Sequence, residues 1–561
     1  MNQIEIYQRW LTETELNDEL HQELMHIQGD AAAIEDRFYR ELEFGTGGLR
    51  GILGAGTNRM NVYTVAKATQ GYSNYLKQAK SEPTVAIGYD SRIHSDTFAQ
   101  TAAEVFAGNG IQVYLYPRLM PTPALSFAVR DLHCDGGVVI TASHNPAKYN
   151  GYKVYGSDGC QITTEAAKAI QQAIDGVDPF GDVKRVQFDE AIQSGRICYI
   201  GEDTVDRYQA AVSTASVLPD GIDKNVAIVY TPLNGAGISC VPCCLQEHGF
   251  TNITIPDEQK NPDGNFPTCP YPNPEVQEAL QVGLKWAEQT QSDLLLATDP
   301  DCDRVGAAVK DGTGYTLING NQMGVLLFDF ICKMRLQNGA MPNKPVAVKT
   351  IVTTPMAAKI AAHYGVELID VLTGFKFIGE QIGLLEKNGE ENRYIFGFEE
   401  SYGYLSGSFV RDKDAVNGSL LICEMFAWYK AHGKSLVDVL DELYQMYGYY
   451  ESKLLSFQFE GADGFDKMQG LMAALRKERP VDIAGLSVER VIDYQWDETG
   501  LPKSNVVRFF LQNGAEAVVR PSGTEPKLKV YLTVVENTKK IDKTQITKMV
   551  NYFKELISYH A

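Results

Sequence analysis

Three aspartates at alternate positions give the strongest chemical signal in this sequence. Asp299, Asp301 and Asp303 directly follow a short apolar segment, so their carboxylates can converge on one hard cation. They do not form an EF-hand, because Arg304 and Lys310 stand where that motif needs glycine and glutamate. Three oxygen ligands leave coordination positions open, which suits Mg²⁺ bridging to a phosphate. A solvated acidic turn is the alternative.

A second polar group, residues 141–146 (TASHNP), follows another apolar segment on a tight turn. Here Ser143 and His144 place a hydroxyl next to an imidazole, which suggests a nucleophile and a base. Adjacent side chains seldom share a hydrogen bond in the geometry that this chemistry needs, so a polar turn ending in Asn-Pro is equally compatible with the segment. Lys153 follows nearby and offers an ammonium group.

Residues 520–527 (RPSGTEPK) have the composition of an anion-binding loop. Two basic side chains flank two hydroxyls, and a glycine allows backbone N–H groups to point inward, as in a phosphate nest. A solvated surface loop is the alternative. The sequence contains no GxxxxGK[ST] motif, and in residues 45–50 (GTGGLR) Arg50 stands where a dinucleotide fingerprint has its third glycine.

The segment at residues 397–403 (GFEESYG) combines carboxylates with a hydroxyl after an apolar strand. Glu399 and Ser401 suit hydrogen bonding to sugar hydroxyls, and a charged surface turn is the alternative. Further polar residues lie upstream at 373–376 (TGFK) and downstream at 411–414 (RDKD).

The elements that position these groups follow a recurring scheme. After a helical segment over residues 1–45, short apolar strands alternate with polar loops and helices. Such near-continuous apolar strands indicate α/β units covered on both faces, in which ligands usually bind at the carboxyl ends of the strands. We expect strands at residues 84–89, 137–140, 226–230, 294–297, 346–348 and 394–396.

The C-terminal part has a different pattern. Residues 506–512 and 515–520 are predicted to form a hairpin, because Asn513-Gly514 between them is a strong signal for a type I′ turn. A strand at 528–535 and an amphipathic helix at 544–559 follow. We therefore expect an α+β domain at this end of the chain.

The 561 residues correspond to about four domains of ~150 residues each. Changes in pattern suggest boundaries near residues 205, 320 and 450. The predicted domains are 1–205, 206–320, 321–450 and 451–561.

The composition narrows the class of protein. Lys and Arg total 51 against 71 Asp and Glu, and the net charge of −20 argues against a nucleic-acid or anionic-membrane partner. It does not exclude a small anionic substrate in a locally basic cleft. No apolar segment reaches the ~18 residues of a membrane span and no signal peptide is recognisable, so a cytoplasmic location is expected.

The ten cysteines are scattered, which indicates a reduced chain. Cys240, Cys243 and Cys244 form the one cluster, but no second CxxC or HxxxH stands at ligand spacing. We expect small buried hydrophobic residues here and not a zinc or redox site.

Taken in order, TASHNP, DPDCDR, GFEESYG and RPSGTEPK resemble the motifs of the α-D-phosphohexomutase superfamily. With FGTGGLRG near residue 44, the chain resembles the phosphoglucomutase/phosphomannomutase members over most of its length. TGFKFIG and SGTEPK are most similar to the branch that also contains phosphopentomutase and glucose-1,6-bisphosphate synthase. The resemblance implies four domains around a central cleft, three similar α/β domains with mixed sheets and a smaller α+β C-terminal lid domain.

The resemblance also implies a role for each polar loop. Ser143 would be the phosphoserine, and an oxygen of its phosphate would hold Mg²⁺ together with Asp299, Asp301 and Asp303. Lys153 or His144 would serve as the general base. The implied substrate-binding residues are Arg50 and Arg304 beside the phosphoserine, Thr373, Glu399 and Ser401 at the sugar hydroxyls, and Lys413, Arg520, Ser522, Gly523 and Thr524 at the non-reacting phosphate.

The implied reaction interconverts glucose 1-phosphate and glucose 6-phosphate, with mannose phosphates as further candidate substrates. Glucose 1,6-bisphosphate would be both the intermediate and the activating primer. Phosphopentomutase or glucose-1,6-bisphosphate synthase activity at the same site is the alternative. A metal-dependent serine phosphatase is less favoured, because one Asp triad without His ligands fits a two-metal site poorly. A non-catalytic sugar-phosphate sensor is also disfavoured, and the oligomeric state stays open.

Overall fold

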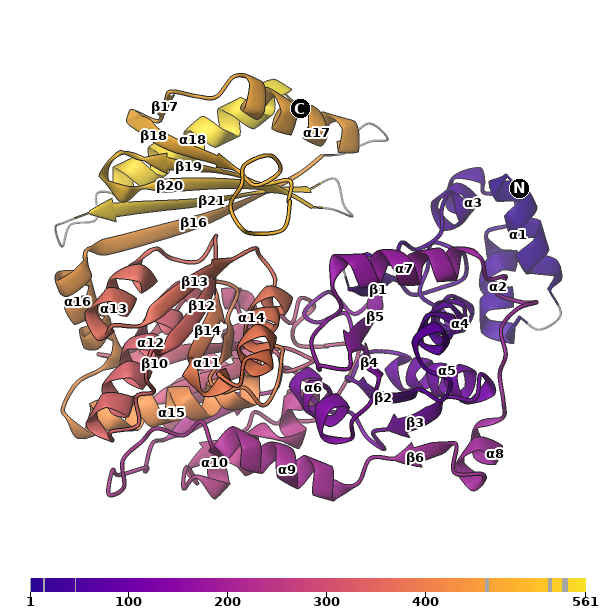
Figure 1. Cartoon of the computed structure of the whole chain (residues 1–561), viewed down its shortest axis with the longest axis horizontal. Coiled ribbons are helices and arrows are strands. Elements are labelled where there is room, and N and C mark those ends of the chain that lie inside the picture. The colour runs from indigo at the N-terminus through magenta and orange to yellow at the C-terminus, as the bar shows by residue number, and fades with distance from the viewer. Residues whose placement is uncertain are drawn as a thin grey trace.

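The computed structural model describes residues 2–13, 16–45, 47–459, 464–522, 527–536 and 543–560. Within these residues the chain forms four successive units, each built on one β-sheet (Figure 1). The first three sheets combine parallel and antiparallel strands, whereas every pair in the fourth sheet is antiparallel. The predicted fold class, three α/β units followed by an α+β unit, is confirmed.

The N-terminal segment forms three short helices at the outer side of the first unit (Figure 1). Each helix begins where an Asn or Asp side chain accepts a backbone N–H of the first turn. Trp10 and Phe38 lie in the small apolar core between them. The predicted helical segment is confirmed as α1 (Gln3–Thr12), α2 (Asp18–His26) and α3 (Ala31–Phe38).

The first sheet has the strand order β1-β5-β4-β2-β3-β6. Its central strand is buried on both faces, since Val85 and Ile87 point into one apolar core and Ala86 into another. Helices α4, α5 and α7 supply the first core, and α6 and α9 the second. The strands are β1 (Gly48–Ile52), β2 (Thr84–Tyr89), β3 (Gln112–Leu115), β4 (Gly136–Ile140), β5 (Tyr149–Gly156) and β6 (Ile197–Tyr199). The helices are α4 (Val62–Ala79), α5 (Ser95–Gly108), α6 (Thr122–Asp131), α7 (Thr164–Asp175), α8 (Phe188–Gln193) and α9 (Glu202–Ser213).

The second and third units repeat the α/β scheme with the strand orders β11-β10-β9-β7-β8 and β13-β12-β14-β15. The second contains β7 (Ile228–Thr231), β8 (Ile253–Thr254), β9 (Leu294–Thr298), β10 (Val305–Asp311), β11 (Gly314–Ile318), α10 (Val241–Glu247) and α11 (Gln277–Thr290). The third contains β12 (Val346–Thr350), β13 (Glu367–Val371), β14 (Tyr394–Glu399), β15 (Gly403–Leu405), α12 (Gly320–Gln337), α13 (Met356–Tyr364), α14 (Phe375–Lys387), α15 (Ala415–Ala431) and α16 (Leu436–Tyr447).

One large apolar core joins these units, because helices α6 and α9 of the first unit pack into the same cluster as β7, β9, β12 and β14. Strands β7, β9, β12 and β14 are buried along their whole length. The prediction that Cys240, Cys243 and Cys244 are small buried residues is confirmed for Cys240 and Cys244, which lie in this core, and is wrong for Cys243, which is exposed at the surface of α10.

The fourth sheet has the order β16-β21-β20-β19-β18-β17 and lies above the third unit in Figure 1. The predicted hairpin is present, and Asn513 and Gly514 have φ values of 63° and 76°, as expected for its Asn-Gly turn. Helices α17 (Gly464–Lys477) and α18 (Lys543–His560) cover one face of the sheet. The strands are β16 (Tyr449–Gln458), β17 (Asp482–Ile483), β18 (Leu486–Asp493), β19 (Val507–Leu511), β20 (Glu516–Pro521) and β21 (Lys527–Glu536).

The six strands predicted in the α/β part correspond to β2, β4, β7, β9, β12 and β14. The domain boundaries near residues 205, 320 and 450 remain predictions. Among the helices of the described residues, none combines the length and apolar character that a membrane crossing requires.

Candidate active site

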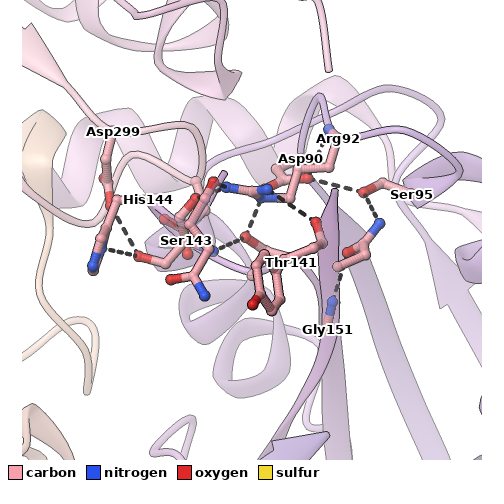
Figure 2. Close-up of polar contacts among 12 residues, drawn as sticks. Asp90, Arg92, Ser95, Thr141, Ser143, His144, Gly151 and Asp299 are labelled. Atoms are coloured by element: carbon pink, nitrogen blue, oxygen red, sulfur yellow. Dashed lines mark hydrogen bonds and ion pairs between the residues drawn. The ribbon is translucent and has the colours of Figure 1, made fainter. Parts of the chain in front are cut away.

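Ser143 lies on a tight turn after β4 and is almost completely buried. Its φ of 53° is in the left-handed region, which a serine adopts only where its surroundings impose it. The Thr141 hydroxyl accepts the Ser143 backbone N–H at 2.8 Å and donates to Asp90 Oδ2 at 2.6 Å (Figure 2). The turn that presents the serine hydroxyl is therefore fixed by internal hydrogen bonds.

The buried guanidinium group of Arg92 holds the same turn from outside. It donates to the backbone carbonyls of Ser143 at 2.6 Å and Pro146 at 3.1 Å, and to two more carbonyls of this segment. Its Nε lies 3.5 Å from Asp90 Oδ2, and both residues follow β2, which pairs with β4 (Figure 2). Sequence reasoning does not single out this pair, although opposite charges directly after a buried strand are a signal that would find it.

Arg92→Lys is expected to lower kcat about 10- to 100-fold and to cost about 1–3 kcal/mol of stability. A lysine keeps the charge but cannot form the planar fork that binds several carbonyls at once. Steady-state kinetics and thermal unfolding measure the two effects. Arg118→Lys, at an exposed ion pair with Glu202, is the control. An unchanged kcat in the Arg92 variant would show that the turn keeps its geometry without this clamp.

The Ser143 hydroxyl contacts two groups that can influence its reactivity. Its Oγ lies 3.1 Å from His144 Nδ1 and 3.0 Å from Asp299 Oδ2, so its proton can be shared with either group (Figure 2). Adjacent Ser and His side chains are expected to share a hydrogen bond only seldom. Here the two atoms lie within hydrogen-bond distance, with the backbone of Ser143 in the left-handed region. Burial, followed by the charges of Arg304 and Arg50, lowers the pKa of His144 well below its usual range, which keeps the ring neutral.

Asp299, Asp301 and Asp303 converge as their alternate spacing predicts. Each offers a carboxylate oxygen within 4.8 Å of the others, and all three residues are buried. Cys302, with a φ of 52°, occupies the left-handed position of the turn between them. Thr122 ties this loop to the first unit, since its hydroxyl donates to Asp301 Oδ2 at 3.1 Å and its backbone N–H to the Asp301 carbonyl at 2.8 Å.

The carboxylate oxygens of this triad fit a hard divalent cation. Asp301 Oδ1 and Asp303 Oδ1 are buried and accept no hydrogen bond from the described residues. A buried acceptor without a partner is costly, so these two atoms are available to a ligand. In the described part of the chain no other group of His, Cys, Asp and Glu meets at metal-ligand spacing.

Two buried lysines face the triad from different units. Lys153 Nζ lies 2.7 Å from Asp301 Oδ2 and 3.3 Å from Asp303 Oδ2, and Lys413 Nζ lies 2.9 Å from the same Asp303 oxygen. Burial opposes the charge on both lysines, but the aspartates outweigh it and raise the pKa of each lysine. The cations and carboxylates therefore form one network across the first three units.

The predicted sugar-reading residues meet at the ends of two strands in the third unit. Glu399 ends β14 and accepts the backbone N–H of Gly374 at 2.9 Å. The neighbouring Thr373 has a buried hydroxyl with no hydrogen-bond partner among the described residues. Burial raises the pKa of Glu399, with Lys413 and Arg304 acting against the shift. Ser401 follows on the turn to β15, so the loop presents acceptors and donors suited to hydroxyl groups.

Arg50 lines a cavity of about 480 Å³ that also includes Thr141 and Lys153. The outer wall of this cavity comes partly from the N-terminal helices, with Asp36. Arg304 contacts the site from the second unit, where Glu275 holds its guanidinium and its Nε lies 3.8 Å from Asp303 Oδ1. Burial opposes its charge, but Glu275 and Asp303 outweigh this and raise the pKa of Arg304.

The C-terminal loop is described only in part. Arg520 lies on β20, and the backbone N–H of Ser522 donates to the Lys527 carbonyl at 2.7 Å. Gly523 and Thr524 lie outside the described residues. Lys529, which sequence reasoning does not single out, pairs directly with Arg520 across the strands. Lys529 is basic and lies two residues after Lys527, so a strand here places both side chains on the same face. This spacing is the signal that could have identified it.

The site combines a buried serine beside a neutral imidazole with three converging carboxylates that could hold a cation, and with lysine and arginine side chains close by. Phosphoryl-transferring enzymes use this combination of groups. Comparison with known proteins agrees with this class. Four models of the phosphoglucomutase/phosphomannomutase family match the chain in order: α/β/α domain I at residues 41–179, domain II at 206–312, domain III at 319–447 and the C-terminal domain at 462–545.

The chain is 38% identical over 536 residues to a phosphoglucomutase of Staphylococcus aureus, a match that covers 92% of this chain and 94% of that protein. The crystal structure of a putative phosphomannomutase from Thermus thermophilus has the same fold, with a TM-score of 0.68, 22% identity, and coverage of 92% of this chain and 99% of that one. The phosphoglucomutase pp63/parafusin from Paramecium gives a TM-score of 0.66 at 18% identity, covering 92% and 96% of the two chains. The chain belongs to the phosphoglucomutase/phosphomannomutase family.

Proposed function

We propose that this chain is a phosphoglucomutase that moves a phosphoryl group between O1 and O6 of glucose through a phosphorylated Ser143. The observation that carries the proposal is the position of Ser143 Oγ, 3.1 Å from His144 Nδ1 and 3.0 Å from Asp299 Oδ2. A nucleophile in this position has a proton acceptor on one side and a cation site on the other. The Staphylococcus aureus relative named as a phosphoglucomutase supports the choice of glucose.

We propose that Asp299, Asp301 and Asp303 hold Mg²⁺ together with an oxygen of the Ser143 phosphate. Asp301 Oδ1 and Asp303 Oδ1, which accept no hydrogen bond from the described residues, support this assignment. When bound, the ion supplies positive charge that offsets the negative charge of the phosphoryl oxygens. Glucose 1,6-bisphosphate acts as the primer that phosphorylates Ser143.

The transfer itself is a balanced exchange at one phosphorus atom. The free hydroxyl oxygen of the sugar phosphate attacks the phosphorus on Ser143, a new O–P bond forms, and the Oγ–P bond breaks. The sugar hydroxyl loses its proton and Ser143 Oγ gains one. His144 Nδ1 is the ring nitrogen in reach of Oγ, so we assign His144 to this proton. Lys153, held by Asp301, acts as a fixed positive charge beside the phosphate.

The intermediate then presents its other phosphate to Ser143, so the sugar must bind in two orientations. Glu399, Ser401 and Thr373 read hydroxyl groups that are available in both orientations. Arg50 and Arg304 act at the reacting phosphate. Lys413, which the resemblance assigns to the non-reacting phosphate, lies 2.9 Å from Asp303 Oδ2, so we place it at the reacting phosphate as well. We further propose that the C-terminal unit acts as a lid that excludes water, because a phosphoserine open to solvent would hydrolyse. The free thiols of the chain agree with a cytoplasmic location.

At the far end of the sugar, Arg520, Ser522, Gly523 and Thr524 would bind the phosphate that does not react. Arg520→Ala is expected to raise KM about 10- to 150-fold, the equivalent of about 1.5–3 kcal/mol for a hydrogen bond to a charged group. Initial-rate kinetics with glucose 1-phosphate measure the change. Arg479→Ala is the control, because Arg479 is an exposed arginine just after α17. A KM equal to that of the unmodified protein would remove Arg520 from the binding site.

The activity is tested by incubating the purified protein with Mg²⁺, glucose 1-phosphate and a trace of glucose 1,6-bisphosphate. Fast formation of glucose 6-phosphate that depends on the bisphosphate is the expected result. Conversion of ribose 1-phosphate in preference to glucose 1-phosphate would indicate a phosphopentomutase, and net formation of bisphosphate from a phosphoryl donor a synthase. Release of inorganic phosphate would indicate a phosphatase. Neither conversion nor phosphorylated Ser143 would overturn the proposal.

A further inference from the structure

A loop of the second unit, residues 263–275, contacts the serine turn of the first unit. We call it the proline-rich loop, because it contains Pro267, Pro270, Pro272 and Pro274. Each proline fixes its own φ and restricts the residue before it. The sequence of the loop therefore limits its backbone to few conformations.

One end of the proline-rich loop is anchored on the Arg92 clamp. Phe266 is fully buried, and its ring centroid lies 5.1 Å from the Arg92 guanidinium carbon in a cation–π arrangement. A Cβ on Gly264 would lie 2.4 Å from the Ile93 backbone nitrogen, so only glycine allows the two backbones to approach this closely. The φ of Phe266 is 48°, which a bulky residue adopts only where its surroundings impose it. The loop is thus held against the segment that clamps the Ser143 turn.

The other end of the proline-rich loop holds a second group of the site. Glu275 forms an ion pair with Arg304, whose Nε lies 3.8 Å from Asp303 Oδ1. The backbone N–H of Glu275 donates to Asn273 Oδ1 at 3.0 Å, which fixes this end of the loop. The segment between Phe266 and Glu275 is therefore held at both ends by groups of the candidate active site.

Tyr271 lies in the middle of the proline-rich loop and packs against His144. The two ring centroids are 6.0 Å apart and the ring planes meet at 88°, a T-shaped arrangement. The Tyr271 carbonyl accepts the Asn273 N–H at 2.8 Å and the Cys269 thiol at 3.2 Å. Tyr271 also stands between two prolines, so its backbone is fixed although its side chain is 42% exposed.

The His144 ring has few other restraints. Among the described residues its one hydrogen-bond contact is that of Nδ1 with Ser143 Oγ at 3.1 Å (Figure 2). A single hydrogen bond leaves the imidazole able to rotate about its side-chain bonds, and a misplacement of about 1 Å at a reacting group can cost about 100-fold in rate. The ring of Tyr271, packed perpendicular to the imidazole, restricts this rotation.

We propose that Tyr271 is a positioning residue that holds the His144 imidazole toward Ser143 Oγ. This inference rests on the proposed mutase function, in which His144 exchanges the proton of Oγ. Tyr271 transfers no proton itself, and the role requires its ring but not its hydroxyl group. The second unit, which carries the acidic triad, then also aligns the proton acceptor with the nucleophile of the first unit.

The kinetic test compares two substitutions of Tyr271. Tyr271→Ala is expected to lower kcat about 10- to 100-fold, with KM for glucose 1-phosphate within about threefold. Tyr271→Phe keeps the ring and should restore kcat to within about twofold of the parent. Tyr199→Ala is the matched control, because Tyr199 is 52% exposed on β6, at the edge of the first sheet opposite β1. An unchanged kcat in Tyr271→Ala would overturn the proposal, as would a Tyr271→Phe variant as slow as Tyr271→Ala.

A spectroscopic test examines the position of His144 independently of activity. In protein with isotope-labelled histidine, the ring signals of His144 are identified by their loss in His144→Gln. Tyr271→Ala should shift these signals, whereas Tyr271→Phe should leave them near their position in the parent. The unfolding temperature of both variants should stay close to that of the parent, because Tyr271 is partly exposed.

The two tests separate the positioning role from the mutase function. Unaltered His144 signals in Tyr271→Ala would overturn the positioning role, even in a chain that is an active mutase. An inactive parent whose His144 signals respond as expected would refute the mutase function, while the positioning of His144 by Tyr271 would stand.

Discussion

Ser143→Ala is expected to lower mutase activity about 10³-fold or more, the scale of loss when a covalent nucleophile is removed. The side chain loses the oxygen that would carry the phosphoryl group, while its neighbours His144 and Asp299 keep their positions. The variant should also fail to gain the mass of one phosphate when incubated with glucose 1,6-bisphosphate. Coupled measurement of glucose 6-phosphate and intact-mass analysis test the two expectations.

The fold should survive this change, because a single hydroxyl hydrogen bond contributes about 1 kcal/mol. The unfolding temperature of Ser143→Ala is therefore expected to lie close to that of the parent. Ser157→Ala, an exposed serine on the turn after β5, is the matched control and should keep full activity. Substantial activity in Ser143→Ala, with another residue phosphorylated, would assign the nucleophile elsewhere.

Removal of the cation is expected to have an effect of similar size. A chelator should abolish activity and added Mg²⁺ should restore it. Loss of a residue that hydrogen-bonds to a metal ligand lowers activity roughly 10- to 100-fold. Because Asp301 is itself a proposed ligand, Asp301→Asn is expected to lower activity by more than this. The amide keeps the size of the side chain, and its oxygen can still accept the Thr122 hydrogen bond, but it removes one negative charge from the triad and with it the ion pair with Lys153.

The dependence of activity on Mg²⁺ concentration distinguishes a metal-binding role of Asp301 from a purely structural one. Asp301→Asn should need a much higher concentration for half activation, and isothermal titration should show weaker Mg²⁺ binding. Asp311→Asn, at the exposed end of β10, is the control for an aspartate in the same unit. An unaltered Mg²⁺ requirement in Asp301→Asn would show that the triad does not bind the activating ion.

The parts of the fold that the sequence predicts are those set by local chemistry. Strand β9 is a continuous run of apolar residues, so both its burial and the acidic loop at its end can be read directly. The turn at Asn513-Gly514 is equally local, because only a few residue types adopt positive φ there without strain. The convergence of the three aspartates follows from their alternate spacing within one turn.

Contacts between distant parts of the chain could not be read in this way. Arg92 and the carbonyl of Ser143 are far apart in the sequence, and they meet because β2 and β4 are neighbours in the sheet. Tyr531 likewise meets Ile351 and Leu372 only because the C-terminal sheet packs on the third unit. The contact between Ser143 and His144 could not be predicted from their adjacency, because the left-handed backbone of Ser143 depends on the surrounding turn.

The hydrogen bonds from Thr122 to Asp301 determine which substitutions in this enzyme should affect turnover and which should affect ligand binding. They connect the acidic loop to the unit that carries Ser143, so the chemical step depends on a contact between the first and second units. Arg520, which we place at the non-reacting phosphate, lies on the C-terminal sheet, and that sheet packs against the third unit. Substitutions at the contact between Thr122 and Asp301 should slow turnover at all substrate concentrations. Substitutions near β20 and β21 should instead change which ligands bind tightly. Substrate preference can therefore diverge among relatives while the catalytic rate is preserved.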